Sequence, residues 1–212
     1  MKFELVVDYL KKHFYNYSSQ YIFVIVIFIM GVIFGAILVN NLSYSQKNDL
    51  YNYLTQFFFY VNSEELITFK ELFSQNILHH LQQLFILFLL GISIIGLPFI
   101  LVLLFLKGIV VGFTVGFLVN QFDFQGFLIA LFSIFPQNII VVPVFLIASV
   151  LTINFSVKLI KKLFTNNPNM LFWPITFNYL KGFSLLIILI FIAAAIEALF
   201  STNLLKMVLN LI

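Results

Sequence analysis

The feature that most constrains this chain is a series of long apolar segments that contain few or no charged residues. The first covers residues 21–39 and has no Asp, Glu, Lys or Arg. A helix that crosses the ~30 Å lipid core needs about 20 such residues, at 1.5 Å per residue. The chain is 62% hydrophobic and 9% charged, whereas soluble domains are about 45–50% apolar and about 25% charged. We therefore predict an all-α polytopic membrane protein, with residues 1–212 forming a single integral membrane domain.

The apolar segments predict about five transmembrane helices, at residues 21–39, 77–95, 98–120, 127–155 and 177–200. We separate the second from the third at residues 96–98, because glycine ends helices and proline opens them. A turn at Lys107 instead would leave about 13 residues before Asn120, or ~20 Å of helix, which is too short for the lipid core. The chosen turn places Lys107 about nine residues, or ~14 Å, inside the membrane.

Prolines and a short polar stretch shape the second half of the chain. Residues 121–126, which include Asp123, are expected to form the turn between the third and fourth spans. Pro136 and Pro143 lie inside the fourth span. Because proline lacks an N–H and clashes with the preceding turn, that helix is expected to kink or break there.

Residues 40–76 form the one long polar stretch, and apolar residues recur in it at helical spacing. The first stripe is Leu50, Leu54, Phe57 and Val61, and the second is Leu66, Phe69, Phe73 and Ile77. This spacing predicts two amphipathic helices lying on the membrane. The expected residues for docking a partner on this segment are Leu50, Leu54, Phe57, Val61, Phe69 and Phe73.

The distribution of lysines predicts the orientation, since cytoplasmic loops carry an excess of positive charge. With the amino terminus inside, three lysines fall outside, Lys47, Lys70 and Lys206, and seven fall inside, Lys2, Lys11, Lys12, Lys158, Lys161, Lys162 and Lys181. We therefore expect a cytoplasmic amino terminus, a carboxyl terminus outside the cell, and an outward-facing 40–76 segment.

Composition also limits the chemistry. The chain has no Cys, which excludes thiolate nucleophiles and Cys zinc sites, and its three His lack metalloprotease spacing. His79 and His80 point about 100° apart on a helix, so we interpret them as boundary residues rather than metal ligands. All 11 basic residues are Lys, which argues against nucleic-acid recognition, where Arg dominates. We expect no catalytic residues, no cofactor and no metal.

Five glycines form small-residue faces on two predicted spans. Gly108, Gly112 and Gly116 are spaced by four on one span, and Gly31 and Gly35 on another. Small residues at this spacing let helices approach closely in lipid. The pattern favours internal packing, and dimerisation with a second copy is the alternative.

Four polar residues are predicted to lie within the membrane: Lys107, Gln137, Asn138 and Glu197. Lys107 and the Gln137-Asn138 pair both reach the bilayer midplane and are expected to meet, either as a pocket or as a clamp between two helices. Glu197 falls near the outer interface, where we expect it to be solvated or hydrogen-bonded.

Several segments together resemble the stage II sporulation protein M family. They are FIMGVIFGAILVN (28–40), LSYSQKNDL (42–50), GISIIGLP (91–98), LLFLKGIVVGFTVGFLVNQ (103–121) and PQNIIVVPVFLI (136–147). The resemblance implies a protein of the mother-cell membrane at the asymmetric septum, needed for engulfment of the forespore. It also implies two partners, stage II sporulation proteins D and P, which hydrolyse the cell wall.

Two functions are consistent with these observations. The leading hypothesis is a non-catalytic scaffold that recruits and holds wall hydrolases during septal thinning. The alternative is a small-solute transporter or channel with a midplane pocket around Lys107, Gln137 and Asn138.

Overall fold

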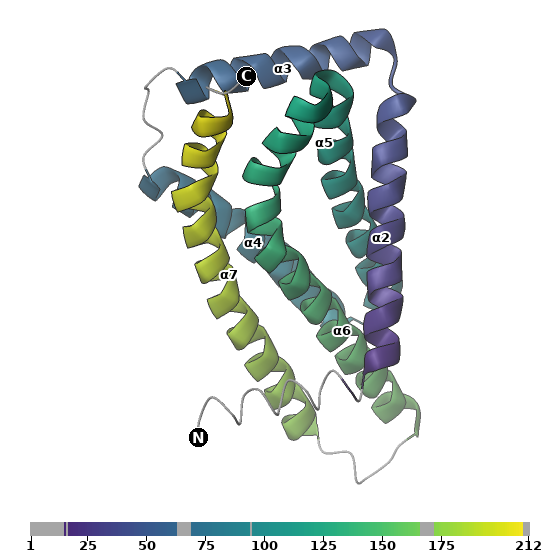
Figure 1. Ribbon diagram of the computed structural model, residues 1–212. Helices are drawn as coiled ribbons and strands as arrows, with labels where there is room; N and C mark the ends of the chain where they lie inside the picture. The colour runs from purple at the N-terminus through teal and green to yellow at the C-terminus, as the bar shows by residue number, and fades with distance from the viewer. Residues whose placement is uncertain (1–14, 16, 63–68, 94, 166–171, 210–212) are drawn as a thin grey trace.

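The computed structural model describes residues 15, 17–62, 69–93, 95–165 and 172–209. The described residues form six main helices and contain no strand, which confirms the predicted all-α fold. The helices are α2 (Ser18–Asn40), α3 (Tyr44–Asn62), α4 (Phe69–Ile92), α5 (Gly96–Ser133), α6 (Phe135–Thr165) and α7 (Phe172–Leu209). α2, α5, α6 and α7 run along the bundle, while α3 lies across one end of it (Figure 1).

Four of these helices are long and apolar enough to cross a membrane: Ser18–Asn40, Gly96–Ser133, Phe135–Lys162 and Trp173–Leu199, among the described residues. The predicted span at 77–95 is not among them. It lies in α4, whose first half carries many polar side chains and which has only about nine uninterrupted apolar residues, Leu84 to Ile92. These provide ~14 Å of helix, less than half of a lipid core.

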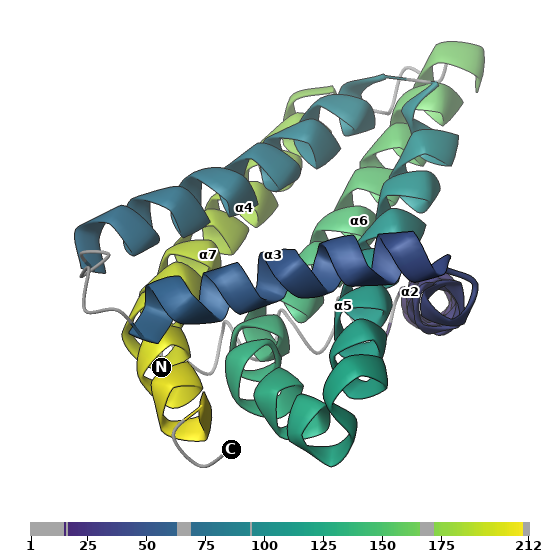
Figure 2. The same cartoon turned by 90° about the horizontal axis from the view of Figure 1, so that it is seen from above.

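α4 runs obliquely through the bundle, from beside α7 below the level of α3 toward the start of α5 (Figure 1). Viewed from above, it extends sideways along α7, whereas α2 is seen end-on (Figure 2). α4 packs against α5, α6 and α7. Its polar side chains therefore have other helices beside them, rather than lipid alone.

Both predicted turns around the third span are present. α4 ends at Ile92 and α5 begins at Gly96, where a Cβ would collide with the Leu90 carbonyl oxygen. α5 consists of two limbs that meet at Asp123, whose backbone has φ 49° and ψ −127°. This left-handed conformation reverses the chain. Directly after it, Gly126 packs on the Leu118 carbonyl, where a side chain would not fit.

The predicted break in the fourth span lies just before its first proline. The second limb of α5 ends at Ser133, and α6 begins at Phe135. Pro136 lies in the first turn of α6, where a missing N–H is tolerated, whereas Pro143 is accommodated inside the continuous helix.

α3 is the first predicted amphipathic helix, and its start is fixed by a capping box. The backbone N–H of Gln46 donates to Ser43 Oγ at 3.4 Å, and the backbone N–H of Ser43 donates to Gln46 Oε1 at 3.0 Å. The second predicted amphipathic helix is not separate. Phe69, Phe73 and Ile77 of its stripe belong to the first turns of α4, which continues without interruption to Ile92, and Leu66 lies outside the described residues.

Candidate functional site

The glycine faces predicted from the sequence pack against each other within one chain. α2 and α5 form the most extensive helix pair in the bundle. Gly31, Gly35, Gly108 and Gly112 are all buried there. A Cβ at Gly108 would collide with the Phe28 carbonyl oxygen. These small residues therefore bring two helix backbones into direct contact, which is the internal packing that the spacing favoured.

Three close backbone contacts show how α2 and α5 are aligned. Positions 108, 112 and 116 of α5 lie against Phe28, Val32 and Ala36 of α2, and in each pair the residue numbers differ by 80. The two helices are therefore parallel and in register. The same offset places Lys107 level with Ile27, about nine residues or ~14 Å beyond the start of α2 at Ser18. The depth of Lys107 in the membrane stays a prediction.

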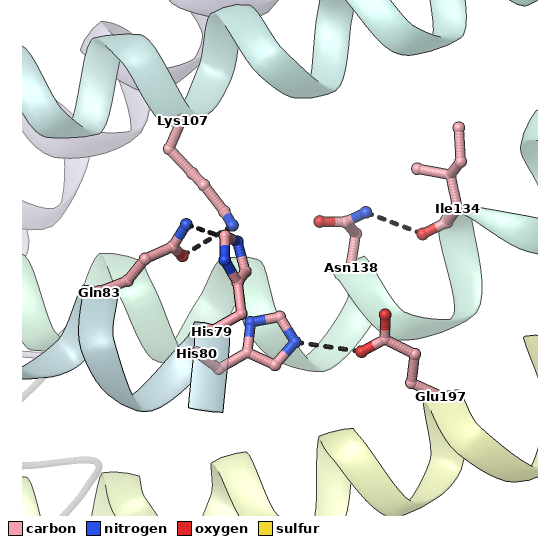
Figure 3. Close-up of polar contacts among 7 residues, drawn as sticks. All are labelled: His79, His80, Gln83, Lys107, Ile134, Asn138 and Glu197. Carbon is pink, nitrogen blue, oxygen red and sulfur yellow. Dashed lines mark hydrogen bonds and ion pairs between the residues drawn. The ribbon is translucent and has the colours of Figure 1, made fainter. Parts of the chain in front are cut away.

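The partners of Lys107 differ from those predicted. Its ammonium donates to Gln83 Oε1 at 2.9 Å, and the Gln83 amide lies 3.0 Å from His79 Nε2 (Figure 3). The ring of Phe145 lies 5.8 Å from Lys107 Nζ. The polar residues near Lys107 come from α4, whose second part was predicted as the second span.

Gln137 and Asn138 therefore do not form a pocket with Lys107. The Asn138 side-chain amide donates to the carbonyl of Ile134, four residues earlier, at 2.8 Å (Figure 3). That carbonyl lies at the break between α5 and α6, and the side chain stabilises the break locally. No hydrogen bond joins Gln137 or Asn138 to Lys107 in the described part of the chain.

Glu197 is hydrogen-bonded rather than solvated. Its Oε2 lies 3.1 Å from His80 Nε2, and the two side chains are 14% and 8% exposed. This contact joins α7 to α4 across the bundle (Figure 3). His79 thus lies on the side of α4 that faces Lys107, and His80 on the side that faces Glu197, as their separation on the helix surface requires. Among the described residues, no group of three side chains is arranged to hold a metal ion.

A cavity of about 230 Å³ lies beside Lys107. Its polar lining is Lys107, Gln83 and His79, and its apolar lining comes from α4, α5 and α6 through Ile86, Leu103, Leu106, Val110 and Phe145. Ile86, Leu106 and Val110 are 47%, 48% and 60% exposed. The rim of the cavity is therefore part of the outer, lipid-facing surface of the bundle.

Sequence reasoning missed a second polar contact, at the end of α4. Ser156 Oγ donates to the Gly91 carbonyl at 2.8 Å, and the Tyr179 hydroxyl donates to the Phe88 carbonyl at 3.0 Å. The last four carbonyls of a helix have no partner within it, so α6 supplies a donor to Gly91, while α7 adds a donor to the carbonyl one turn earlier. The spacing of Ser149, Thr152 and Ser156 on one helical face was the available signal.

The residues predicted to dock a partner have mixed surroundings. Leu54 packs on the cluster formed by Leu118, Ile129 and Ala130, and the Tyr51 ring lies 5.8 Å from Phe122. This side of α3 thus covers the turn between the two limbs of α5. Leu50 and Phe73 are half-buried, whereas the side chains of Phe57, Val61 and Phe69 lie outside the described residues.

The family comparison accounts for most of the chain. The family model described as Stage II sporulation protein M matches residues 24–202. The chain belongs to this family. The match includes α3, α4, α5 and α6 completely, together with the polar cluster around Lys107. No curated protein and no solved structure matches the chain. The protein is therefore a multi-pass sporulation membrane protein, in agreement with the resemblance of its segments.

Proposed function

We propose that this protein is a non-catalytic membrane scaffold that recruits and holds cell-wall hydrolases during septal thinning and forespore engulfment. The family supports a sporulation role, and the resemblance implies stage II sporulation proteins D and P as partners. The observation that carries the proposal is α3, a helix placed across one end of the membrane bundle (Figure 1).

α3 has one face on the bundle and large aromatic side chains elsewhere on its surface. Leu54 packs on the α5 turn, whereas Tyr53 and Phe59 are each 71% exposed. Aromatic residues are enriched at protein interfaces and at membrane surfaces. A helix anchored at one face and apolar at another suits the positioning of a membrane-tethered partner.

The orientation is part of this proposal. Lys158 donates to the Tyr17 hydroxyl at 3.2 Å, so the lysine-rich end of α6 lies beside the start of α2. α3 lies at the opposite end (Figure 1). Because lysines favour the cytoplasmic side, we propose an inner amino terminus, an outer carboxyl terminus, and an α3 that faces the wall from the mother-cell membrane.

Cysteine labelling tests the orientation directly, since the natural chain has no Cys. A membrane-impermeant maleimide added to intact cells should label Tyr44→Cys, which is 88% exposed at the start of α3. It should label Lys161→Cys only after the cells are opened. The reverse pattern would invert the proposed topology.

The partners are tested by affinity purification of the tagged, full-length protein from mild-detergent extracts of sporulating cells. Mass spectrometry should find both wall hydrolases in the eluate and not in a mock purification. Recovery of the protein without either hydrolase would contradict the scaffold proposal.

The α3 surface is tested with Tyr53→Ser combined with Phe59→Ser. This variant should lower hydrolase recovery several-fold while the bundle stays folded, because neither side chain packs inside it. Trp173→Ser is the matched control, since Trp173 is 79% exposed at the other end of the bundle. Polar substitution of Phe57 and Phe73 is expected to weaken recruitment in the same way. Equal recovery in all variants would rule out α3 as the docking surface.

The transporter hypothesis is the second candidate, favoured by a lysine at mid-depth beside a cavity. It predicts that Lys107→Ala abolishes solute flux in proteoliposomes while assembly persists. We rank it second because Gln137 and Asn138, which were expected to complete the pocket, do not line the cavity.

A further inference from the structure

Lys107 lies inside the bundle with no acidic side chain in contact with its ammonium, among the described residues. Its ammonium has three N–H donors, and the one hydrogen bond formed within the described residues is to the neutral Gln83. Glu197, the acidic residue of the neighbouring α7, is paired with His80. Charged groups in the membrane interior are costly and normally pair with one another. Glu197 therefore acts on Lys107 only through space, and no carboxylate of the described residues contacts the ammonium.

The cavity beside Lys107 has the size and lining for one inserted side chain. Its volume of about 230 Å³ is below the ~300–1,000 Å³ of pockets that hold drug-sized ligands. Around the ammonium the wall is mostly apolar, and the rim is exposed to lipid. An occupant from the membrane needs one acidic group on an otherwise apolar body.

We propose that this cavity receives the carboxylate of an Asp or Glu from a transmembrane helix of another protein. Lys107 lies ~14 Å from the level where α2 begins, so a lipid phosphate at the surface is not at its depth. A second copy of this chain lacks a suitable acid among its described residues. Asp49, Glu71 and Asp123 lie in α3, in the first turn of α4 and at the α5 turn, and Glu197 is engaged.

This inference deepens the scaffold proposal and rests on it, because it states the chemistry by which a membrane-anchored partner is selected. A buried acid on the partner helix would distinguish it from apolar helices of the same length. The small-residue contact between α2 and α5 cannot supply that discrimination, since it is already used inside the chain.

The test uses the full-length protein in phosphatidylcholine vesicles and a synthetic leucine-rich transmembrane peptide with Glu at its centre. Energy transfer between fluorophores on the two measures binding. The Glu peptide should bind about tenfold more tightly than the same peptide with Leu at the centre, the scale of one polar contact in lipid. A peptide with Glu at its end should bind like the Leu peptide. Equal binding of all three peptides would overturn the proposal. This comparison needs no variant of the protein, so misfolding of a variant cannot explain the result.

Variants and lipids locate the contact. Lys107→Met should remove the preference for the central Glu, and Lys107→Arg should keep it. Lys181→Met is the control, because Lys181 is exposed on α7 over the Phe177 ring. A preference that persists in Lys107→Met would overturn the proposal. Loss of the preference when phosphatidylglycerol is added would also overturn it, by assigning the cavity to a lipid headgroup. Because no sporulation partner is present, the assay can succeed or fail independently of hydrolase recruitment.

Discussion

α5 takes part in two interfaces that hold the bundle together by different means. Against α2 it places Gly108 and Gly112, and the backbones touch with no polar side chain between them. Against α4 it places Lys107, which reaches Gln83 with a long side chain. Lys107 and Gly108 are adjacent in sequence, and adjacent residues on a helix point about 100° apart. One turn of α5 thus serves both interfaces.

The difference teaches how helices associate where the hydrophobic effect is weak. The α2–α5 interface relies on close packing, which tolerates no added atom. α4 adds polar pairs to its apolar packing, Gln83 with Lys107 of α5 and His80 with Glu197 of α7. In such a pair, the loss of one partner leaves a buried polar group. The α2–α5 interface should be sensitive to added volume, and the polar contacts of α4 to the loss of one partner.

The largest effect is expected from Gly112→Ala. A Cβ at this position would collide with the Val32 carbonyl oxygen, and a backbone atom cannot move aside without separating the helices. We expect a loss of about 3 kcal/mol in the free energy of unfolding, the upper end for overpacking. Denaturation in mixed micelles measures it.

Gly182→Ala is the matched control, because its Cβ would meet the flexible Leu151 side chain at 2.9 Å instead of backbone. It should lower the free energy of unfolding much less. If Gly182→Ala and Gly112→Ala were equally destabilising, close backbone approach would not distinguish the α2–α5 interface.

This interface could be predicted from the sequence because its signal is local. A repeat of small residues every four positions identifies a helix face without knowledge of the partner. The same holds for the turns, since Gly96 and Pro98 end one helix and start another, and residues 121–126 are polar between two apolar segments. The partner helix of each glycine face was the remaining unknown.

The second prediction concerns the His80–Glu197 pair. His80→Leu or Glu197→Leu alone should lower the free energy of unfolding by about 2 kcal/mol, because each leaves a polar group in the bundle without its partner. The double variant should recover most of this loss, since neither residue of the pair then leaves an unpaired polar group in the bundle. A double-mutant cycle in mixed micelles measures the coupling.

Asp49→Leu is the control for removing an acidic residue, because Asp49 is exposed on α3. It should leave the free energy of unfolding nearly unchanged. Additive losses in the double variant would show that His80 and Glu197 do not depend on each other. They would remove the contrast between the α2–α5 interface and the polar contacts of α4.

The polar contacts of α4 could not be predicted from the sequence because they depend on where α4 lies. His79 and His80 were interpreted as boundary residues, and Gln83 fell within the predicted span at residues 77–95. In the structure α4 crosses the bundle obliquely (Figure 1), and its polar side chains contact Lys107 of α5 and Glu197 of α7. Which acceptor Lys107 finds follows from that tilt, and no spacing in the sequence encodes it.

The smallest effect tests whether the end of α4 belongs with the polar contacts. Ser156→Ala removes the donor to the Gly91 carbonyl, and we expect a loss of about 0.6 kcal/mol, the average for such hydrogen bonds in membrane proteins. Ser184→Ala is the control, because its hydroxyl bonds the Lys181 carbonyl of its own exposed turn. A loss in Ser156→Ala that exceeds the control would mean that α4 is held by polar contacts along its length, from His80 to Gly91. Equal values would restrict that role to the Lys107 and Glu197 contacts, leaving the end of α4 to the stacked rings of Phe88, Phe155 and Tyr179.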